Sequence, residues 1–287
     1  MSSPYDPSTA ALTRTHLPAP SPPTEPLSRQ VKLWSTLTEL CELLRLPDGC
    51  EQAFDDEPSF QHLHFQVGQR VHTSGQSFEA LYVVHNGFLK TVSIDEAGNE
   101  QVLSFPMKGD LFGVDGIHHR RHPTEAVALS CCDVIVVPFS RLLGLARRDT
   151  HLEDLIYRII SRELIRQQTQ TCMLGALSAE ARVARFLVTL SERFEAMGYS
   201  GKVFNLRMTR HEIGSYLGLT LETISRALSA FNESGLIKVA QRSIEINDIV
   251  ALKNLRRVPS SYGRGQRGRG AAKRIPLGQL NKSLADA

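Results

Sequence analysis

The stretch TRHEIGSYLGLTLETISRALSAFNESGL at 209–236 constrains the fold more than any other part of the chain. Thr209 and Glu212 have the T-x-x-E spacing of a capping box, which begins a helix by satisfying its first free N–H groups. Gly218 can turn the chain, and Thr220 is a suitable N-cap for a second helix. The segment therefore predicts two helices joined by a short turn that contains glycine, the helix-turn-helix arrangement.

The second helix of this pair is predicted to have two different faces. One is apolar, with spacings of three and four: Leu221, Ile224, Leu228 and Phe231. The other carries Glu222, Ser225 and Arg226. Arginine can donate two hydrogen bonds to guanine, glutamate can accept one from cytosine, and serine is short enough for a thymine methyl. Such a face suits base readout in the major groove of double-stranded DNA, whereas the alternative is a solvated face on a plain helical hairpin.

The residues around this pair favour DNA binding over the alternative. Residues 236–246, LIKVAQRSIEI, predict two short strands around Gln241 and Arg242, which would form a wing. Contacts to phosphates would set the register of the protein on DNA without reading its sequence. The side chains expected at the DNA backbone are Arg207, Thr209, Arg210, Thr220, Thr223, Lys238 and Arg242.

A β-rich region precedes the helical part. From about Phe60 to Phe139, short runs such as ALYVVH and DVIVVPF alternate with glycines, and Gly98 in DEAGNE suits a hairpin turn. Regularly spaced short strands predict a sandwich, jelly roll or small barrel. Residues 29–57 are expected to hold a short helix, with Val31 and Leu33 among its apolar positions.

One long helix is expected over about 149–175, because that segment has no glycine or proline in its interior. Some of its residues recur alternately every three and four positions, as in a heptad seam that a parallel partner helix would bury. The predicted dimer-interface residues are Tyr157, Ile160, Leu164, Gln167, Thr171 and Leu174. An amphipathic helix that packs only on its own domain is the alternative.

The predicted architecture is α+β with five parts. They are a Pro-rich disordered tail (1–28), a β-roll with a short N-terminal helix (29–148), a dimerisation helix (149–177), a winged helix-turn-helix (178–257) and a disordered basic tail (258–287). The net charge is only +3, but nine Lys or Arg and one acid lie between Lys253 and Ala287. A basic end suits a polyanionic partner such as nucleic acid, or is simply solvated.

At MTRHEIGSYLGLTLETISR the sequence resembles the FNR branch of the CRP/FNR family, and the likeness runs over about 57–257. The resemblance implies a cyclic-nucleotide-binding-like β-roll, a dimer helix and a winged helix-turn-helix. Glu222, Ser225 and Arg226 match the branch's E-x-x-S-R pattern, which implies TTGAT half-sites in an inverted repeat. It also implies a homodimeric regulator, more often an activator, of anaerobic, microaerobic or redox-linked genes. The loop DEAGNEQ resembles a family surface that contacts RNA polymerase.

The family's two known cofactors are not expected here. An FNR-type [4Fe–4S] cluster needs four thiolates, three of them near the N-terminus, and the chain has no such trio before the β-roll. The family's Arg-Ser pair for the cAMP phosphate aligns with His122 and Pro123, which replace neither group. The resemblance is therefore to cluster-less relatives similar to FixK, with no metal and no cofactor. The alternative is a β-roll that senses a small molecule or an atypical redox cofactor.

Smaller motifs carry weaker expectations. His118, His119 and His122 could bind a metal or respond to pH, but a solvated loop is the simpler interpretation. Cys131 and Cys132 are neighbours in a strand, so one thiol at most is expected in the core.

Other classes of protein are not indicated. The chain has no phosphate-binding glycine loop, nucleophile elbow or H-E-x-x-H motif, so no enzyme is expected. A ligand-binding regulatory subunit, in which the helical domain merely docks, is a rival. No run of eighteen apolar residues and no signal peptide are evident, so we expect no membrane partner and a cytoplasmic location.

Overall fold

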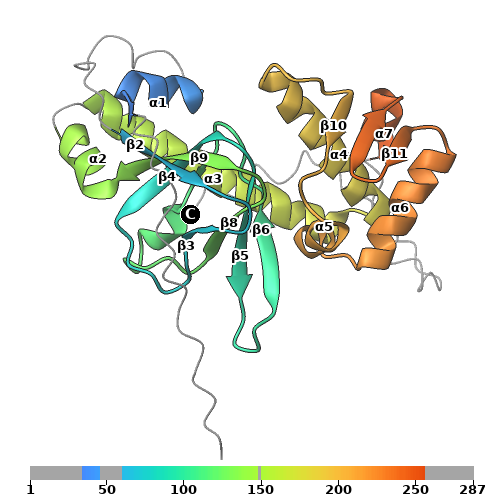
Figure 1. Cartoon of the computed structure of the whole chain (residues 1–287), viewed down its shortest axis with the longest axis horizontal. Coiled ribbons are helices and arrows are strands. Elements are labelled where there is room, and N and C mark those ends of the chain that lie inside the picture. Colours follow the sequence, from blue (N-terminus) through green and yellow to red (C-terminus); the bar gives the residue numbers. More distant parts are fainter. Residues whose placement is uncertain (1–33, 46–59, 148–149, 256–287) are drawn as a thin grey trace, which may run out of the picture.

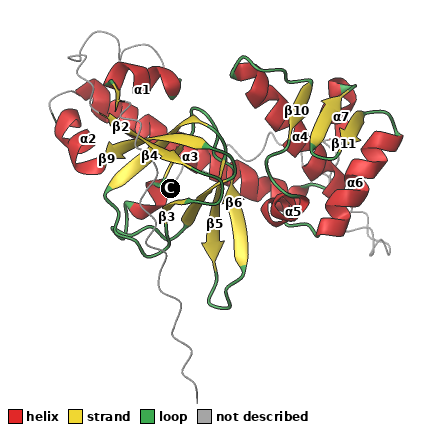
Figure 2. Ribbon diagram, viewed as in Figure 1, coloured by secondary structure: helices red, strands yellow, loops and turns green. Residues whose placement is uncertain are grey.

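The structure is a computed structural model that describes residues 34–45, 60–147 and 150–255. The predicted tails 1–28 and 258–287 lie outside the described residues, as do Val31 and Leu33 of the expected N-terminal helix. A β-roll and a mainly helical lobe are joined by one long helix (Figure 1). Figure 2 shows most strands gathered in the roll and most helices outside it. The expected α+β class is confirmed.

Two antiparallel sheets form the β-roll. The first has the strand order β1-β2-β9-β4-β7, formed by β1 (Trp34–Ser35), β2 (Phe60–Phe65), β4 (Ala80–Asn86), β7 (Leu111–Phe112) and β9 (Cys132–Pro138). The second has the order β3-β8-β5-β6, formed by β3 (Arg70–His72), β5 (Leu89–Ile94), β6 (Glu100–Ser104) and β8 (Glu125–Ala128). Side chains from both sheets, among them Leu89, Ala126 and Val134, are fully buried together. Burial of apolar surface between the sheets is the main force that holds the roll together.

Turns and one short helical segment complete the roll. Gly98 adopts φ 82 in the β5–β6 hairpin, a left-handed conformation that glycine tolerates, as the sequence predicted. Asp95 accepts hydrogen bonds from the backbone N–H groups of Ala97 and Asn99, which fixes this turn. The 3-10 helix η1 (Val114–Gly116) follows β7.

Three helices cover the outer face of the first sheet. They are α1 (Leu37–Leu43), α2 (Phe139–Ala146) and the start of α3 (Thr150–Ala176). Within the described residues α1 is shorter than the helix expected over 29–57, because a capping box of Thr36 and Glu39 begins it only at Leu37. The long helix expected over 149–175 is α3, and it continues past the roll (Figure 1).

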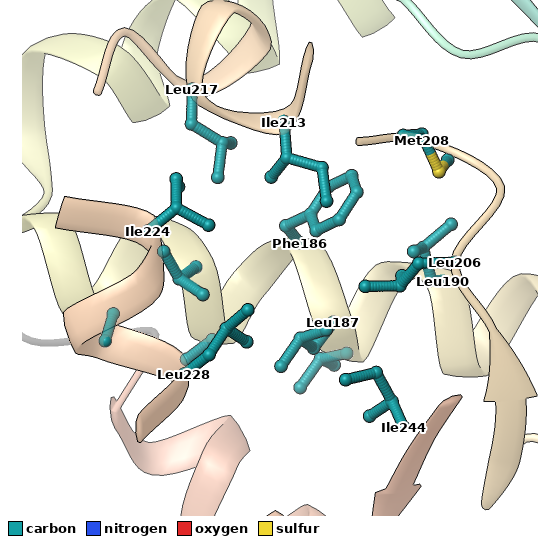
Figure 3. Packing of buried hydrophobic residues seen from close by; sticks show 14 of the residues in the cluster. Phe186, Leu187, Leu190, Leu206, Met208, Ile213, Leu217, Ile224, Leu228 and Ile244 are labelled. Carbon is teal, nitrogen blue, oxygen red and sulfur yellow. The ribbon is translucent and has the colours of Figure 1, made fainter. Parts of the chain in front are cut away.

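Two residues separate the end of α3 from the start of the helical lobe. Its elements are α4 (Ala179–Ala196), β10 (Val203–Asn205), α5 (Arg210–Leu217), α6 (Leu221–Glu233), β11 (Ile237–Ala240), β12 (Ser243–Ile246) and α7 (Ile249–Leu255). Figure 3 shows Leu187 of α4, Ile213 of α5, Ile224 of α6 and Ile244 of β12 converging in one core. The three strands pair in the order β10-β12-β11. No helix among the described residues is long and apolar enough to cross a membrane.

One sequence expectation for the roll is wrong. His122 is fully buried rather than part of a solvated loop, and its ring stacks on that of His72 with centroids 4.0 Å apart. The backbone N–H of His122 donates to the Gln76 carbonyl, which draws the end of the loop into the roll. Gly116 leaves the necessary room, since a Cβ there would lie 3.0 Å from His122 Nδ1. His118 and His119 are exposed, as expected.

The neighbouring cysteines Cys131 and Cys132 differ in burial. Cys132, the first residue of β9, is fully buried, whereas Cys131, just before the strand, is exposed. The expectation of at most one core thiol is confirmed.

Candidate nucleic-acid interface

The turn between α5 and α6 fixes the angle between these two helices. Thr209 accepts a hydrogen bond from Glu212 N, and the Glu212 carboxylate accepts one from Thr209 N, so the predicted capping box is present. Gly218 ends α5 in the left-handed region at φ 62. Leu219 N donates to the Gly214 carbonyl, which closes the turn. Both predicted helices and their short glycine turn are confirmed.

The buried face of α6 differs in one position from the prediction. Ile224, Leu228 and Phe231 are buried, but Leu221 is 44% exposed. Ala227 occupies the core in addition. Leu221 is the first residue of α6, and the core begins only one turn later, so helical periodicity alone misplaces it.

The opposite face of α6 carries the predicted base-reading residues. Glu222 and Arg226 are exposed, and Ser225 is partly exposed between them in sequence. Thr220 is the N-cap, and its hydroxyl accepts from Thr223 N at 3.2 Å. Hydrogen bonds from its own backbone N–H and from Thr220 lower the pKa of the Glu222 carboxyl. The carboxylate is therefore ionised near neutral pH and can accept a hydrogen bond from a base.

The two helices also meet through polar side chains. An Arg210 guanidinium nitrogen donates to Ser225 Oγ at 3.3 Å. A residue expected at the phosphates therefore touches one expected at the bases. This bond orients both side chains on the same exposed surface of the lobe.

The remaining predicted backbone contacts are also at the surface. Arg207 and Arg210 are exposed before and at the start of α5, and Lys238 and Arg242 are exposed on the wing. The wing is the β11–β12 hairpin, whose turn residue Gln241 has φ 55. Exposed cationic side chains therefore precede α6 in the sequence and also follow it on the wing. Which of them touches DNA stays a prediction.

The predicted seam on α3 is uncovered in the single chain. Tyr157 is 63% and Leu164 56% exposed, and Ile160 is also exposed. Gln167 and Thr171 are exposed, and Leu174 is partly buried. Large apolar side chains in a row on one helix are typical of a surface that another chain covers. Their role in a dimer stays a prediction.

Sequence reasoning missed a set of contacts between the roll and the helical lobe. Lys90 of β5 forms an ion pair of 3.1 Å with Glu212, the capping residue of α5. Val102 N of β6 donates to Ser215 Oγ at 2.9 Å, and the Ser215 hydroxyl donates to the Glu100 carbonyl. No sequence pattern signals these contacts, because the partners lie more than a hundred residues apart.

A buried carboxylate links three parts of the molecule. Asp110, between β6 and β7, accepts hydrogen bonds from Arg166 of α3 and Arg193 of α4. Burial alone would raise the pKa of Asp110, but the guanidinium groups of Arg193 and Arg166 hold it below its usual value. One ionised side chain, Asp110, therefore connects α3 and α4 to the roll.

The described thiols do not converge. Among residues 34–45, 60–147 and 150–255, no three His, Cys, Asp or Glu side chains are arranged to hold a metal ion. Cys41 is buried, whereas Cys131 and Cys172 are exposed on different elements. These residues do not fit an iron–sulfur cluster, and the absence of a cofactor stays a prediction.

A cavity of about 660 Å³ lies between the roll, α3 and the end of α5. Its lining includes Thr91, Asp115, Thr124, Arg166 and Gln170. Pro123 also lines it, whereas His122 is packed against Phe78 and His72 in the core.

Known proteins match both lobes. The family described as cyclic nucleotide-binding domain matches residues 62–149, and the Crp-like helix-turn-helix domain matches 181–255. The "Anaerobic regulatory protein" of Pasteurella multocida is 40% identical over 190 residues, 66% of this chain and 70% of that protein. The "Transcriptional activator protein Anr" of Pseudomonas protegens is 38% identical, over 64% of this chain and 76% of its own.

Among solved structures, FixK2 from Bradyrhizobium japonicum has a TM-score of 0.64 and 28% identity, and covers 69% of this chain and 97% of its own. The order of roll, long helix and winged lobe agrees with both family matches. The chain belongs to the CRP/FNR family and is a DNA-binding transcription regulator.

Proposed function

We propose that the protein binds inverted repeats of TTGAT-type half-sites as a homodimer and mainly activates genes for anaerobic, microaerobic or redox-linked metabolism. The exposed face of α6 carries this proposal, since Glu222, Ser225 and Arg226 project from the first turns of the helix. A recognition helix contacts base edges with its N-terminal residues. The names of the relatives, among them an anaerobic regulatory protein and a transcriptional activator, support the choice of target genes.

Each side chain has a separate role in this proposal. Arg226 donates two hydrogen bonds to guanine, and Glu222 accepts one from cytosine N4. Ser225 contacts a neighbouring thymine while it holds Arg210 near the phosphates. Lys238 and Arg242 contact phosphates from the wing, which adds affinity without sequence preference.

The proposed dimer places two such helices on one face of DNA. Leu164 and Tyr157 are exposed on α3, and a parallel partner helix would bury both. Two reading helices then contact half-sites about one helical turn, roughly 34 Å, apart. The hairpin loop around Gly98 is proposed to contact RNA polymerase. We expect no catalytic step in this function and a cytoplasmic location for the protein.

Two alanine variants test the roles on DNA. Arg226→Ala is expected to lose about 1–3 kcal/mol of discrimination at one G·C pair of each half-site. Lys238→Ala is expected to weaken binding to all sequences and to lower the salt slope by about 1. Both are measured by fluorescence titration with single-base variants of the site. If Arg226→Ala weakened all sites equally, Arg226 would contact the DNA backbone only.

A second candidate is a regulator whose roll senses a small molecule. The cavity of about 660 Å³ beside α3 favours it. Neither His122, buried under aromatic rings, nor Pro123 supplies the cation and hydroxyl that a cyclic nucleotide phosphate requires. Calorimetric titration with cyclic nucleotides tests this candidate, and saturable binding would favour it over a regulator without a small-molecule ligand.

A further inference from the structure

A second cavity lies where the roll, α3 and the helical lobe meet. Its volume is about 320 Å³, and residues of α1, the β6–β7 connection, α3 and α4 line it. Arg45, after α1, donates a hydrogen bond to the Ala196 carbonyl at the end of α4. The cavity therefore lies between elements that belong to different lobes.

The charges around this cavity do not balance. The cationic side chains that line it are Arg45, Lys108, Arg162, Arg166 and Arg193. The acidic ones are Asp110, Glu163 and Glu192. Glu192 forms an ion pair of 3.0 Å with Lys253, which lies outside the lining. Five cations are therefore left with two carboxylates.

The two remaining carboxylates, Asp110 and Glu163, already interact with arginines of the cavity lining. Asp110 accepts hydrogen bonds from both Arg166 and Arg193, and Glu163 lies 3.9 Å from Arg166. Burial raises the pKa of the Glu163 carboxyl, so its negative charge is held less firmly than that of an exposed glutamate. Neither carboxylate forms an ion pair with Arg45, Lys108 or Arg162, the outer cations of the described lining.

The outer cations keep donors for a ligand. Arg162 donates one hydrogen bond to the Leu44 carbonyl at 2.7 Å, and Arg45 donates one to Ala196. A guanidinium group has five N–H donors, and most of those on Arg45 and Arg162 form no hydrogen bond to another residue that the structure describes. Lys108 is exposed and forms no ion pair with any acidic residue in the described part of the chain.

We propose that this cavity binds a small anion with at least two negative charges, carried on phosphate or carboxylate groups. Arg162 and Arg45 donate to its oxygens, because planar guanidinium groups suit both kinds of anion, and Lys108 adds a third positive charge. The ligand connects α1 and the roll with α3 and α4, so its binding favours the arrangement of lobes seen here. Anion binding at this site requires neither the proposed DNA sequence nor the cavity of about 660 Å³ between the roll, α3 and α5.

The test is calorimetric titration of the full-length protein with pyrophosphate and, separately, with citrate. Sodium chloride of equal ionic strength is the reference for screening. Saturable binding of either anion is the expected result, and the one that binds more tightly identifies the class. Binding of neither above the chloride reference would overturn the proposal.

Variants locate the site. Lys108→Gln with Arg162→Gln is expected to weaken binding about tenfold or more, since hydrogen bonds to charged groups are lost. Arg158→Gln, an exposed change outside the cavity on the same helix, is the matched control and leaves the affinity unchanged. Single Lys108→Gln serves if the double variant does not fold, because this side chain is exposed.

A third variant separates this cavity from the DNA surface. Arg226→Ala removes a cation from α6 and is expected to leave anion binding unchanged. If Arg226→Ala weakened it and the Lys108 and Arg162 changes did not, the anion would bind the DNA surface, and the proposal would be wrong.

Discussion

The histidines of one loop show how far the burial of a single side chain can be predicted from the sequence. The motif containing His118, His119 and His122 predicts a solvated loop, which is correct for the first two residues only. His122 enters the core because Gly113 and Gly116 leave room beside it. Such a long-range fit leaves no periodic signal in the sequence. Leu221 shows the reverse case, since its spacing predicts burial and its place at the start of α6 exposes it.

The buried histidine pair gives a pH prediction. Burial and the nearby His122 ring lower the pKa of His72 to about 4, from an ordinary value of 6.5. Asp115 and Glu125, which face the ring, oppose this only in part. The unfolded chain therefore takes up a proton below pH 6.5 that the folded chain refuses until about pH 4. The His72 contribution to the free energy of unfolding is therefore greatest above pH 6.5, and we expect it to fall by about 3 kcal/mol toward pH 4.

Urea unfolding between pH 7.5 and 4.5 measures this slope. His72→Phe keeps an aromatic ring beside Tyr82 and Phe112 and is expected to reduce the slope. His119→Gln, an exposed change, is the control and is expected to keep it. An unchanged slope in His72→Phe would assign the acid sensitivity to other groups.

At the scale of elements, the α5–α6 turn follows from local sequence. The capping box that begins α5, the glycine that ends α5 and the threonine N-cap of α6 each act within four residues, so the sequence could predict them. The contacts of α5 with β6 could not be predicted, because Ser215 bonds to the backbone of Glu100 and Val102 without any pattern that links them.

The turn also gives a stability prediction. A Cβ at Gly214 would lie 2.6 Å from the Leu219 carbonyl oxygen, which is backbone and cannot move freely. Gly214→Ala is therefore expected to destabilise the protein by about 1–3 kcal/mol, as over-packing does. Gly175→Ala is the control: nothing lies within 4 Å of its Cβ, and alanine is favoured in helices. Thermal unfolding distinguishes them, and equal stability of the two variants would contradict the packing argument.

The seam of α3 gives a prediction about assembly. Leu164→Glu places a charge in the middle of the predicted interface and is expected to convert dimers to monomers. Thr169→Glu adds the same charge on the opposite side of the helix, where it is exposed, and is expected to leave the dimer intact. Sedimentation velocity measures both. A Leu164→Glu dimer of unchanged stability would show that α3 packs on its own chain only.

For the whole molecule, the sequence predicts the order of the lobes better than their junction. Glycine-spaced strands, a long helix without glycine and a capped helix pair each have a local signature. The junction depends on Asp110, Arg166 and Arg193, which lie 83 residues apart at the widest and meet only in the fold. The exposure of Glu222, Ser225 and Arg226 on α6 could be predicted because one helix presents all three, whereas the contact of Arg210 with Ser225 required the structure.

The proposed function depends on α6 reading a specific DNA sequence. The most direct test is the affinity of the full-length protein for a TTGAT inverted repeat and for a scrambled palindrome of equal length, at one fixed salt concentration. Specific sites are expected to bind roughly a thousandfold more tightly or better. Equal affinities for the two palindromes would contradict sequence-specific binding by α6.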